Sequence, residues 1–541
     1  MSGLISRDST GLRKADDFCS RRRQPGALAL IIVAGALASV LMFWITENGP
    51  GVSPDSVTYI ETARNLLGGN GFSSGGQPMT HYPPAYPLLL ALVALLQHGD
   101  TVQAGRLLAV LFFGANVALF GLAVFLSTKR SWVTTGCAIC IFVVSAPILS
   151  THSMAWSEAP YITFTLAALL LLSLYVVRPS LNLILAASLC VGCAMATRYV
   201  GVTLLVPLVC DILVFGKRPL KQKIGHTLLA ATVALLPLVS WVIRNSVVAE
   251  TATNRTLALH LFGLQHTQQA IATMYEFILL PISIPQKLES LQVGVPVALF
   301  LVSIMFLHRK GYLRRNWNAI HVVLPTHCIA FHLTYSAFLV LSISVFDAQT
   351  PLDYRILLPA FLVIVIVGIA LAWSLSSALD SSILRFGLAA FVFLLVLTNS
   401  DVAVSEAVSI HKNGKGYTAL AWQDSQTIAS VRSLANGRKV YSNGHDAIIF
   451  LTGIPATSLP FVTDPLSRVS KSDFNTQLQA MCREVAEDEA IVVYLNAIGR
   501  WYLPTLDEVQ TKCGLLILEK FNDGAIYRRP SGNNTQEAGV P

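Results

Sequence analysis

The stretch GALALIIVAGALASVLMFWIT, residues 26–46, contains no charged residue and is long enough to cross a lipid bilayer as a helix. It is followed by Pro54-Asp55-Ser56-Val57-Thr58-Tyr59, a short amphipathic segment, and the Pro-rich run Tyr82-Pro83-Pro84-Ala85-Tyr86-Pro87. An acidic residue beside a membrane span is ordinarily just a solvated flanking residue. The return of the chain to the membrane soon after Asp55 also fits a reaction site at the boundary between lipid and water. The rest of the sequence decides between these two interpretations.

The composition is that of a membrane protein. The mean hydropathy is +0.59, with 53% hydrophobic and 13% charged residues, whereas roughly a quarter of the residues of a soluble domain are charged. The formal net charge of +8 does not indicate nucleic acid as a partner, because the basic residues cluster between apolar runs and form no basic stripe with interleaved aromatic residues. We therefore expect a multi-pass helical protein that contacts membrane lipid and no nucleic acid.

Eleven apolar runs are expected to span the membrane as helices. They lie at about residues 26–46, 102–127, 132–150, 159–177, 180–197, 199–215, 225–243, 291–308, 319–346, 355–373 and 384–400. The segment 88–96 is too short to cross, and we expect it to form an interfacial helix under the Asp55 loop.

The distribution of basic residues orients these spans. Six basic residues precede the first run, which is longer than the apolar part of a removable signal peptide. Basic residues also gather in the loops at 129–130, 178, 217–223 and 309–315, all on the same side of the expected membrane. By the positive-inside rule that side is cytoplasmic. Asp55 and everything after about residue 401 then lie outside the inner (plasma) membrane.

The sequence divides into four parts. We expect a cytoplasmic tail at 1–25, a helical membrane domain at 26–400, a small extracytoplasmic α/β domain at 401–530 and a disordered tail at 531–541. Within the α/β domain the pattern predicts strands at 439–442, 490–495, 515–519 and 525–528, and helices at about 418–435 and 473–486. Cys482 and Cys513 lie in this domain and are free to pair if it faces an oxidising compartment.

Polar residues recur at the outer ends of the expected helices. They are Asp55, Ser157-Glu158, Thr197-Arg198-Tyr199, Arg244-Asn245 and Asp353-Tyr354-Arg355. A single arginine at such a place is ordinarily a residue that reaches from the membrane to water. Asp55 and Glu158 on one face with three arginines are less easily explained in this way, because ionisable groups at membrane depth are costly and tend to be functional.

These residue types suit the transfer of a sugar from a lipid phosphate. A carboxylate can take the proton of an acceptor hydroxyl as it attacks the anomeric carbon. Guanidinium groups can bind the phosphate leaving group and stabilise its growing charge. The sequence contains no Walker-type glycine loop and no dinucleotide fingerprint, so ATP-driven transport is not supported.

Taken in order, these segments resemble those of the GT-C membrane glycosyltransferases, in the bacterial branch related to protein O-mannosyltransferases and the lipid A aminoarabinose transferase. The resemblance covers about residues 27–373. It rests on the Asp55 loop with its Ala63–Leu67 and Pro83–Pro87 segments, on Ser157-Glu158, on Thr197-Arg198-Tyr199, on Arg244-Asn245 and on Arg355-Ile356-Leu357-Leu358-Pro359.

The resemblance implies roles for individual residues. Asp55 falls where the family places the general base or acceptor-orienting carboxylate, and Glu158, where many relatives have Asp, falls on a supporting carboxylate. Arg355 falls on a residue that binds the lipid phosphate. The expected substrate-binding set is completed by Arg198, Arg244, Tyr59, Tyr82 and His81. No cofactor is expected; His81 and His152 are candidate metal ligands, as some relatives require, although each is more simply an interfacial polar residue.

The resulting prediction is an inverting glycosyltransferase. Its donor would be a polyprenyl-monophosphate sugar and its acceptor an extracytoplasmic glycan, lipid or protein. The alternative is a lipid-linked saccharide carrier or flippase that uses the same groups for binding alone. Transporters often show repeat symmetry and charges at mid-bilayer; apart from Asp211 near a cytoplasmic end, this sequence shows neither. A non-catalytic scaffold would leave the outer carboxylates and arginines unexplained.

Overall fold

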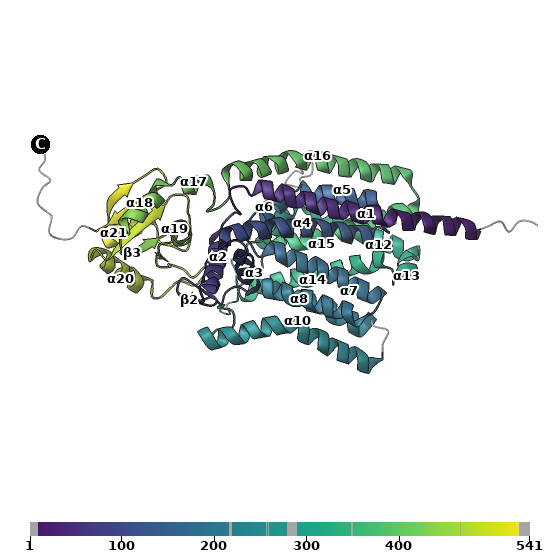
Figure 1. Cartoon of the computed structure of the whole chain (residues 1–541), viewed down its shortest axis with the longest axis horizontal. Coiled ribbons are helices and arrows are strands. Elements are labelled where there is room, and N and C mark those ends of the chain that lie inside the picture. Colours follow the sequence, from purple (N-terminus) through teal and green to yellow (C-terminus); the bar gives the residue numbers. More distant parts are fainter. Residues whose placement is uncertain are drawn as a thin grey trace, which may run out of the picture.

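The computed structural model describes residues 9–529 except 216–218, 256, 258, 278–288, 348–349 and 466. A bundle of long helices makes up most of the molecule, and a smaller domain with a sheet lies at one end of it (Figure 1). The N-terminal end of the first helix emerges at the opposite end of the bundle (Figure 1). The expected tail at 531–541 lies outside the described residues.

Among the described residues, seven helices are long and apolar enough to cross a membrane. They are α1 (Ser9–Ile45, apolar from Gly26), α4 (Thr101–Ser127), α7 (Glu158–Val177), α10 (Leu220–Ala249), α14 (Ile320–Val345), α15 (Tyr354–Leu379) and α16 (Ser382–Asn413). Each coincides with one of the eleven apolar runs predicted from the sequence. The helical membrane fold is therefore confirmed, whereas the count of eleven spans is not.

The other predicted spans are bent, broken or short helices. The run at 132–150 forms α5 (Trp132–Val143) and α6 (Ala146–His152), which meet at 68°. The bend falls just before Pro147, the second residue of α6, because proline lacks the N–H that a continuous helix needs. The remaining runs form α8 (Leu181–Thr197), then η1 (Tyr199–Leu204), α9 (Leu205–Cys210) and the π-helical η2 (Asp211–Phe215), and finally α12 (Glu289–Arg309).

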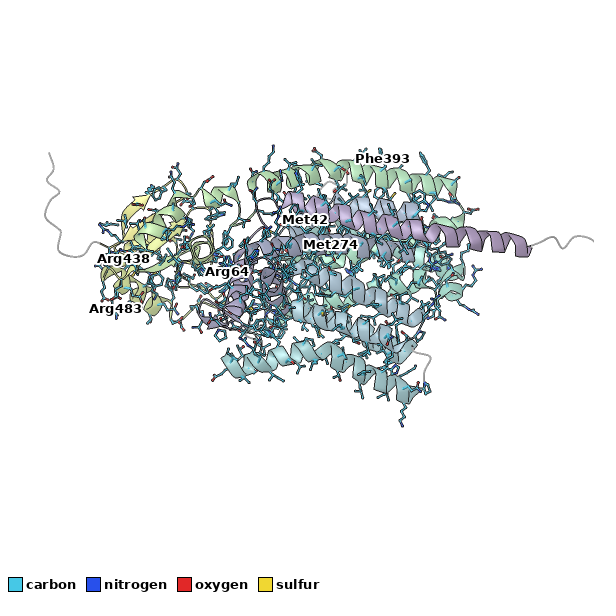
Figure 2. All side chains as sticks on the ribbon, viewed as in Figure 1. Met42, Arg64, Met274, Phe393, Arg438 and Arg483 are labelled. Atoms are coloured by element: carbon cyan, nitrogen blue, oxygen red, sulfur yellow. A yellow bond between two sulfur atoms is a disulfide. The ribbon has the colours of Figure 1, made fainter. Side chains whose placement is uncertain are left out.

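The outer faces of the bundle are apolar, as a lipid environment requires. Phe393 on α16 is 65% exposed, while Met42 on α1 is fully buried among neighbouring helices. Figure 2 shows the two side chains on their helices. Charged side chains such as Arg438 and Arg483 lie on the sheet domain instead (Figure 2).

Two short helices lie between the bundle and the sheet domain (Figure 1). α2 (Pro54–Leu67) follows α1, and α3 (Ala85–Leu95) precedes α4, with the hairpin β1 (Ser73–Ser74) and β2 (Gln77–Pro78) between them. α3 is the short helix that the sequence predicts at 88–96, and it packs against α2. α11 (Leu264–Glu276) packs against α15, and the single turn α13 (Tyr312–Asn316) follows α12.

The C-terminal domain is built on a five-stranded sheet in the order β4-β3-β5-β7-β6. The strands are β3 (Lys439–Ser442), β4 (Ala456–Ser458), β5 (Ala490–Leu495), β6 (Leu516–Lys520) and β7 (Gly524–Arg528). β3 pairs in parallel with β4 and β5, and β7 pairs antiparallel with β5 and β6. The four strands predicted from the sequence are present, and the three-residue β4 was missed because it is too short to show a pattern.

The helices of this domain differ more from the prediction. The helix expected over 418–435 is two helices, α17 (Leu420–Gln423) and α18 (Gln426–Leu434), because the Ser425 side chain caps α18 by accepting from Ile428 N at 3.1 Å. α20 (Phe474–Ala486) was predicted, while α19 (His445–Thr452) and α21 (Leu506–Cys513) were not. Cys482 and Cys513 form a disulfide that joins α20 to α21.

Two glycines allow α1 and α4 to approach closely. A Cβ atom on Gly114 would lie 2.0 Å from Ser39 Oγ and 2.6 Å from the carbonyl oxygen of Gly35. Gly136 on α5 is a matched control, because a Cβ atom there would meet nothing within 4 Å.

We expect Gly114→Ala to lower the free energy of unfolding by about 1–3 kcal/mol, the usual cost of overpacking a filled contact. Gly136→Ala should leave it unchanged or slightly raised. Thermal unfolding of both variants in the same detergent measures the difference. Equal midpoints for the two variants would contradict the close packing of α1 on α4.

Candidate active site

Asp55 is placed at the first turn of α2 by a serine cap. Ser53 lies at the N-cap with an extended backbone, and its Oγ accepts from Ser56 N at 3.4 Å. The same Oγ accepts from Trp156 Nε1 at 2.7 Å, which ties the start of α2 to the turn before α7. The Asp55 side chain is 27% exposed, so it faces both the protein and the space outside it.

Glu158 lies at the start of α7 and is buried, with 1% of its side chain exposed. Its Oε1 accepts hydrogen bonds from Arg198 Nη1 and from Arg355 Nε. Its Oε2 is buried with no hydrogen-bond partner among the described residues. Burying an ionised carboxylate is costly unless it is paired and hydrogen-bonded, and two guanidinium groups do both here.

Arg355 joins the two carboxylates. It is the second residue of α15, a helix capped by Asp353, whose Oδ1 accepts from Ile356 N at 3.0 Å. Arg355 Nη2 lies 2.6 Å from Asp55 Oδ2, while its Nε bonds Glu158. Its guanidinium carbon also lies 4.4 Å from the centroid of the Trp156 ring, a cation–π contact.

Arg198 occupies a break between two helical segments. α8 ends at Thr197, Arg198 is extended, and η1 begins at Tyr199. Because the backbone leaves the helix at this point, the Arg198 side chain reaches Glu158 and, at 3.4 Å, the hydroxyl of Ser157. Asp55, Arg355, Glu158 and Arg198 thus form one chain of alternating charges with no formal net charge, which we call the charge chain.

Aromatic residues surround the Asp55 end of the charge chain. Tyr82 donates its hydroxyl to Asp55 Oδ1 at 2.7 Å. The Tyr59 ring packs edge-on against Tyr82, with centroids 4.8 Å apart, and its hydroxyl lies 3.4 Å from Ser157 Oγ. The His81 ring packs edge-on against Tyr82 from the other side at 4.7 Å.

The protonation states follow from these contacts. Burial by itself raises the pKa of Asp55, but the charge of Arg355 and the hydrogen bond from Tyr82 outweigh it and hold the pKa below its ordinary value. Burial and the Asp55 charge raise the pKa values of Tyr59 and Tyr82. At neutral pH the site therefore presents an anionic carboxylate between neutral phenol groups.

Arg244, also predicted to bind substrate, has other partners. Its Nη1 donates to Met79 O at 2.7 Å and its Nη2 to Phe72 O at 2.8 Å, at the two ends of the β1–β2 hairpin segment. The neighbouring Asn245 donates to Thr80 O at 3.3 Å. In the described structure Arg244 therefore holds the loop that leads to Tyr82, and a direct contact with substrate stays a prediction.

Two contributors to the site were not singled out from the sequence. One is Trp156, whose stacking on Arg355 depends on a turn that sequence spacing does not reveal. The other is Arg255 in the loop after α10, whose guanidinium carbon lies 6.0 Å from the centroid of the Tyr199 ring. Its Nε is buried without a hydrogen-bond partner among the described residues. Burial and the charge of Arg255 lower the pKa of His81.

His81 and His152, the two candidate metal ligands, have different surroundings. His152 is buried, with Asn116 Nδ2 at 3.0 Å from its Nε2 and Ile148 O at 2.8 Å from its Nδ1, so both ring nitrogens have protein partners. Across the part of the chain that the structure describes, no three His, Cys, Asp or Glu residues are grouped so as to hold a metal ion.

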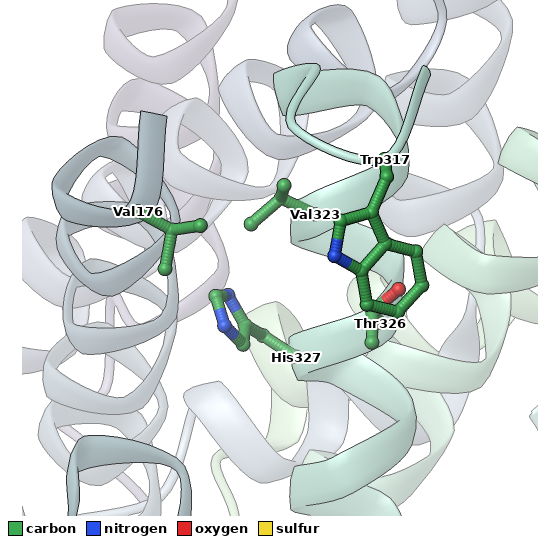
Figure 3. A pocket seen from close by; sticks show the side chains of 5 residues that line it. All are labelled: Val176, Trp317, Val323, Thr326 and His327. Atoms are coloured by element: carbon green, nitrogen blue, oxygen red, sulfur yellow. The ribbon is translucent and has the colours of Figure 1, made fainter. Parts of the chain in front are cut away.

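A small cavity lies at the other end of α7 from Glu158. It has a volume of about 20 Å³ and is lined by Val176, Trp317, Val323, Thr326 and His327 (Figure 3). This is room for about one water molecule. His327 bonds Asp211 at 2.7 Å and Ser173 at 2.7 Å, so its imidazole belongs to a buried polar contact between helices. The cavity is too small to hold a sugar or a phosphate.

Part of the site lies in a segment that is similar to a known protein family. A family model described as dolichyl-phosphate-mannose-protein mannosyltransferase matches residues 81–243, a part that contains Glu158 and Arg198 but not Asp55 or Arg355. No curated protein matches the chain in sequence.

Solved structures resemble the whole chain. The structure of ArnT from Cupriavidus metallidurans bound to undecaprenyl phosphate is 14% identical, with a TM-score of 0.53 over 93% of this chain and 98% of that one. The archaeal oligosaccharyltransferase AglB from Archaeoglobus fulgidus, in complex with an inhibitory peptide and a dolichol-phosphate, is 13% identical, with a TM-score of 0.49 over 87% and 70% of the two chains. The first likeness shows a shared fold, and the resemblance to the GT-C type stated from the sequence is confirmed.

We expect the charge chain to contribute to the free energy of unfolding. Glu158→Gln removes the charge between two guanidinium groups, and we expect the free energy of unfolding to fall by about 3–5 kcal/mol, the cost of breaking a buried ion pair. Asp55→Asn should cost clearly less, because Asp55 is partly exposed and pairs with one guanidinium.

Thermal unfolding in one detergent ranks the variants. Glu61→Gln is the control: Glu61 also lies on α2 but bonds Ser74 Oγ at 2.7 Å and Gly75 N at 2.9 Å, outside the charge chain. A larger loss for Asp55→Asn than for Glu158→Gln would show that Glu158 is not the centre of the chain.

Proposed function

We propose that the protein transfers a sugar from a polyprenyl-monophosphate carrier to an extracytoplasmic acceptor, with inversion at the anomeric carbon. The observation that carries the proposal is the contact of 2.6 Å between Arg355 Nη2 and Asp55 Oδ2, two partly exposed groups held over the buried Glu158. It sets a cation suited to phosphate beside a carboxylate suited to a hydroxyl proton, at the end of the helical bundle. ArnT, which shares the fold, was solved bound to undecaprenyl phosphate, in keeping with a lipid-phosphate donor here.

The donor phosphate would bind at Arg355. A phosphate can accept two parallel hydrogen bonds from one guanidinium group. The guanidinium group of Arg355 is already held in place by its contacts with Trp156 and Glu158. Arg255 adds a second cation near His81. As the bond between the anomeric carbon and the phosphate oxygen breaks, its electron pair goes to the phosphate, and these cations stabilise the developing charge.

Asp55 would activate the acceptor. The acceptor hydroxyl attacks the anomeric carbon from the face opposite the phosphate, its proton passes to Asp55, and the products are the glycosylated acceptor and polyprenyl monophosphate. While Asp55 pairs with Arg355 its pKa is low, which makes it a weak base. Phosphate that engages Arg355 would loosen this pair and raise the basicity of Asp55. Donor binding would thus prepare the base, with Glu158 keeping both arginines in position.

The proposed location is the plasma membrane, with the charge chain and the C-terminal domain on the extracytoplasmic side. The disulfide between Cys482 and Cys513 supports an oxidising compartment for that domain. The basic loops support a cytoplasmic location for the other end of the bundle. Lys129 Nζ lies 5.4 Å from the centroid of the Tyr312 ring in α13, and α13 lies at the end of the bundle far from the sheet domain (Figure 1). The donor would then wait in the outer leaflet and the acceptor, a glycan, lipid or protein, would enter from water.

The enzymatic test uses purified protein with a panel of radiolabelled polyprenyl-phosphate sugars and membrane fractions as acceptors. We expect wild-type protein to move label to an acceptor and release polyprenyl phosphate. Asp55→Asn should lower the initial rate at saturating donor by about 10²–10⁴-fold, the usual loss on removing a general base. Glu158→Gln should lower it less, although it is the less stable protein.

Glu61→Gln is again the control and should keep a near-normal rate, because the Glu61 carboxylate accepts its hydrogen bonds from Ser74 and Gly75, outside the charge chain. A reversed order, with Asp55→Asn active and Glu158→Gln inactive, would assign the base to Glu158. Full activity in both variants would remove the catalytic interpretation and leave a lipid-linked saccharide carrier.

The orientation is tested with single cysteines. With the cysteines outside the disulfide replaced by alanine, Ser433→Cys on the C-terminal domain and Ser382→Cys at the start of α16 are labelled in intact cells by an impermeant maleimide. Both positions are exposed in the structure. We expect Ser433→Cys to react and Ser382→Cys to react only after the cells are opened. Reaction of both from outside would contradict the proposed orientation.

A further inference from the structure

The segment that leads into α2 is held between two other segments. Gly51 N donates to Ser153 O at 2.8 Å, and Ala155 N donates to Gly51 O at 2.8 Å. On its other side Val52 N donates to Lys415 O at 3.3 Å, and Tyr417 N donates to Val52 O at 2.8 Å. The three segments thus form two parallel bridges, which end a few residues before Asp55 and Glu158.

Glycine is required where these segments meet. Gly416 has φ +59°, and a Cβ atom on it would lie 2.1 Å from Val52 O. A Cβ atom on Gly51 would lie 2.2 Å from Met154 Sδ. At Gly416 the two backbones are therefore closer than a side chain permits, whereas at Gly51 the space is filled by the Met154 side chain. A change at Gly416 must displace the segment that contains Val52.

Lys415 extends the same contact to Arg355. Its Nζ donates to Ser150 Oγ at 2.5 Å and to Glu406 Oε1 at 2.7 Å. Ser150 Oγ lies 3.3 Å from the hydroxyl of Tyr354, the residue before Arg355. Lys415 therefore contacts the approach to Asp55 through its carbonyl group and reaches the start of α15 indirectly, through Ser150.

Tyr417 ties residues 415–418, which we call the connector, to the sheet domain. Tyr417 is buried and donates its hydroxyl to Asp446 Oδ2 at 2.9 Å, and Asp446 pairs with Arg500 at 2.6 Å. A single apolar cluster also runs from α2 into the domain, and it includes Val57 and Ile60 with Ile448 and Ile428. α2 is therefore buried between α3 and the C-terminal domain.

We propose that the connector Lys415–Thr418 is a positioning element, through which the C-terminal domain holds Asp55 and Arg355 in register over Glu158. The inference rests on the proposed function, because the relative position of Asp55 and Arg355 matters for the rate only if these residues act in sugar transfer. A tether without this role would affect stability alone. A positioning element must also change the rate of the chemical step, since a displacement of about 1 Å in a catalytic group costs up to roughly 10²-fold.

Glycine variants test the contact. Gly416→Ala inserts a Cβ atom against Val52 O, while Gly453→Ala, at φ +74° in the same domain, meets nothing within 4 Å. Both carry a similar backbone penalty for a left-handed alanine. In hydrogen–deuterium exchange of the full-length protein, Gly416→Ala should speed exchange at residues 50–53 and 153–156, and Gly453→Ala should not.

The same pair is compared in the transfer assay. Gly416→Ala should lower kcat by about 10–100-fold with donor KM changed by less than about 3-fold, and Gly453→Ala should match wild type. Unchanged exchange, or equal kcat in the two variants, would overturn the proposal.

Lysine variants give a second test that does not strain the backbone. Lys415→Met removes both hydrogen bonds of the ammonium group and should lower kcat by about 10-fold or more. Lys415→Arg, which can bond Ser150 and Glu406 again, should recover most of the loss. Lys412→Met, at an exposed lysine on the same stretch, is the control and should behave as wild type. No rescue by arginine would overturn the role of Lys415.

The two proposals fail in different ways. If wild-type protein transfers no sugar from the panel, the proposed function fails, and the exchange data alone decide whether the connector couples the three segments. If wild-type protein is active while Gly416→Ala and Lys415→Met keep its kcat, the function stands and the positioning role is lost.

Discussion

The site depends on one buried carboxylate. Glu158 is almost fully enclosed, and its Oε1 accepts from two guanidinium groups that come from different parts of the chain. Without Glu158, Arg198 and Arg355 would be like charges in a poorly hydrated place, and each would move toward water. With it, Arg355 is held where its free side meets Asp55. The partly exposed end of the charge chain is the part that a substrate can reach.

The helix ends around Glu158 show how the fold meets this requirement. Asp55, Glu158 and Arg355 all lie in the first turn of a helix, and Arg198 lies at the break that ends α8. The N–H groups of a helix's first turn and the C=O groups of its last turn have no hydrogen-bond partner within the helix. The helix ends around Glu158 therefore combine polar backbone groups with polar side chains at the edge of an apolar bundle. The irregular spans are therefore part of the site: a straight helix through Arg198 would direct that side chain elsewhere.

The C-terminal domain is joined to the site through backbone as well as side chains. The bridges between residues 51–52, 154 and 416 hold the segment that leads into α2, and the shared apolar cluster packs α2 against α3 and the domain. Such a domain limits the freedom of Asp55, since a short helix packed on one face only would be free to rock. The sheet itself brings no group to the charge chain among the contacts described, and its influence passes through the connector.

The membrane class, the position of the long helices, most strands of the C-terminal domain and the residue types gathered on one face could be predicted from the sequence. These follow from local properties: uncharged runs must be helical in lipid, and charges accumulate where runs end. It also singled out Asp55, Glu158, Arg198 and Arg355, because their places at span ends are unusual for ionisable residues. The sequence could not show that Glu158 is shared by two arginines, that Arg244 holds a loop instead, or that Trp156 and the connector at 415–418 support the site. These facts depend on contacts between residues up to several hundred positions apart, and on helix breaks whose direction no local pattern encodes.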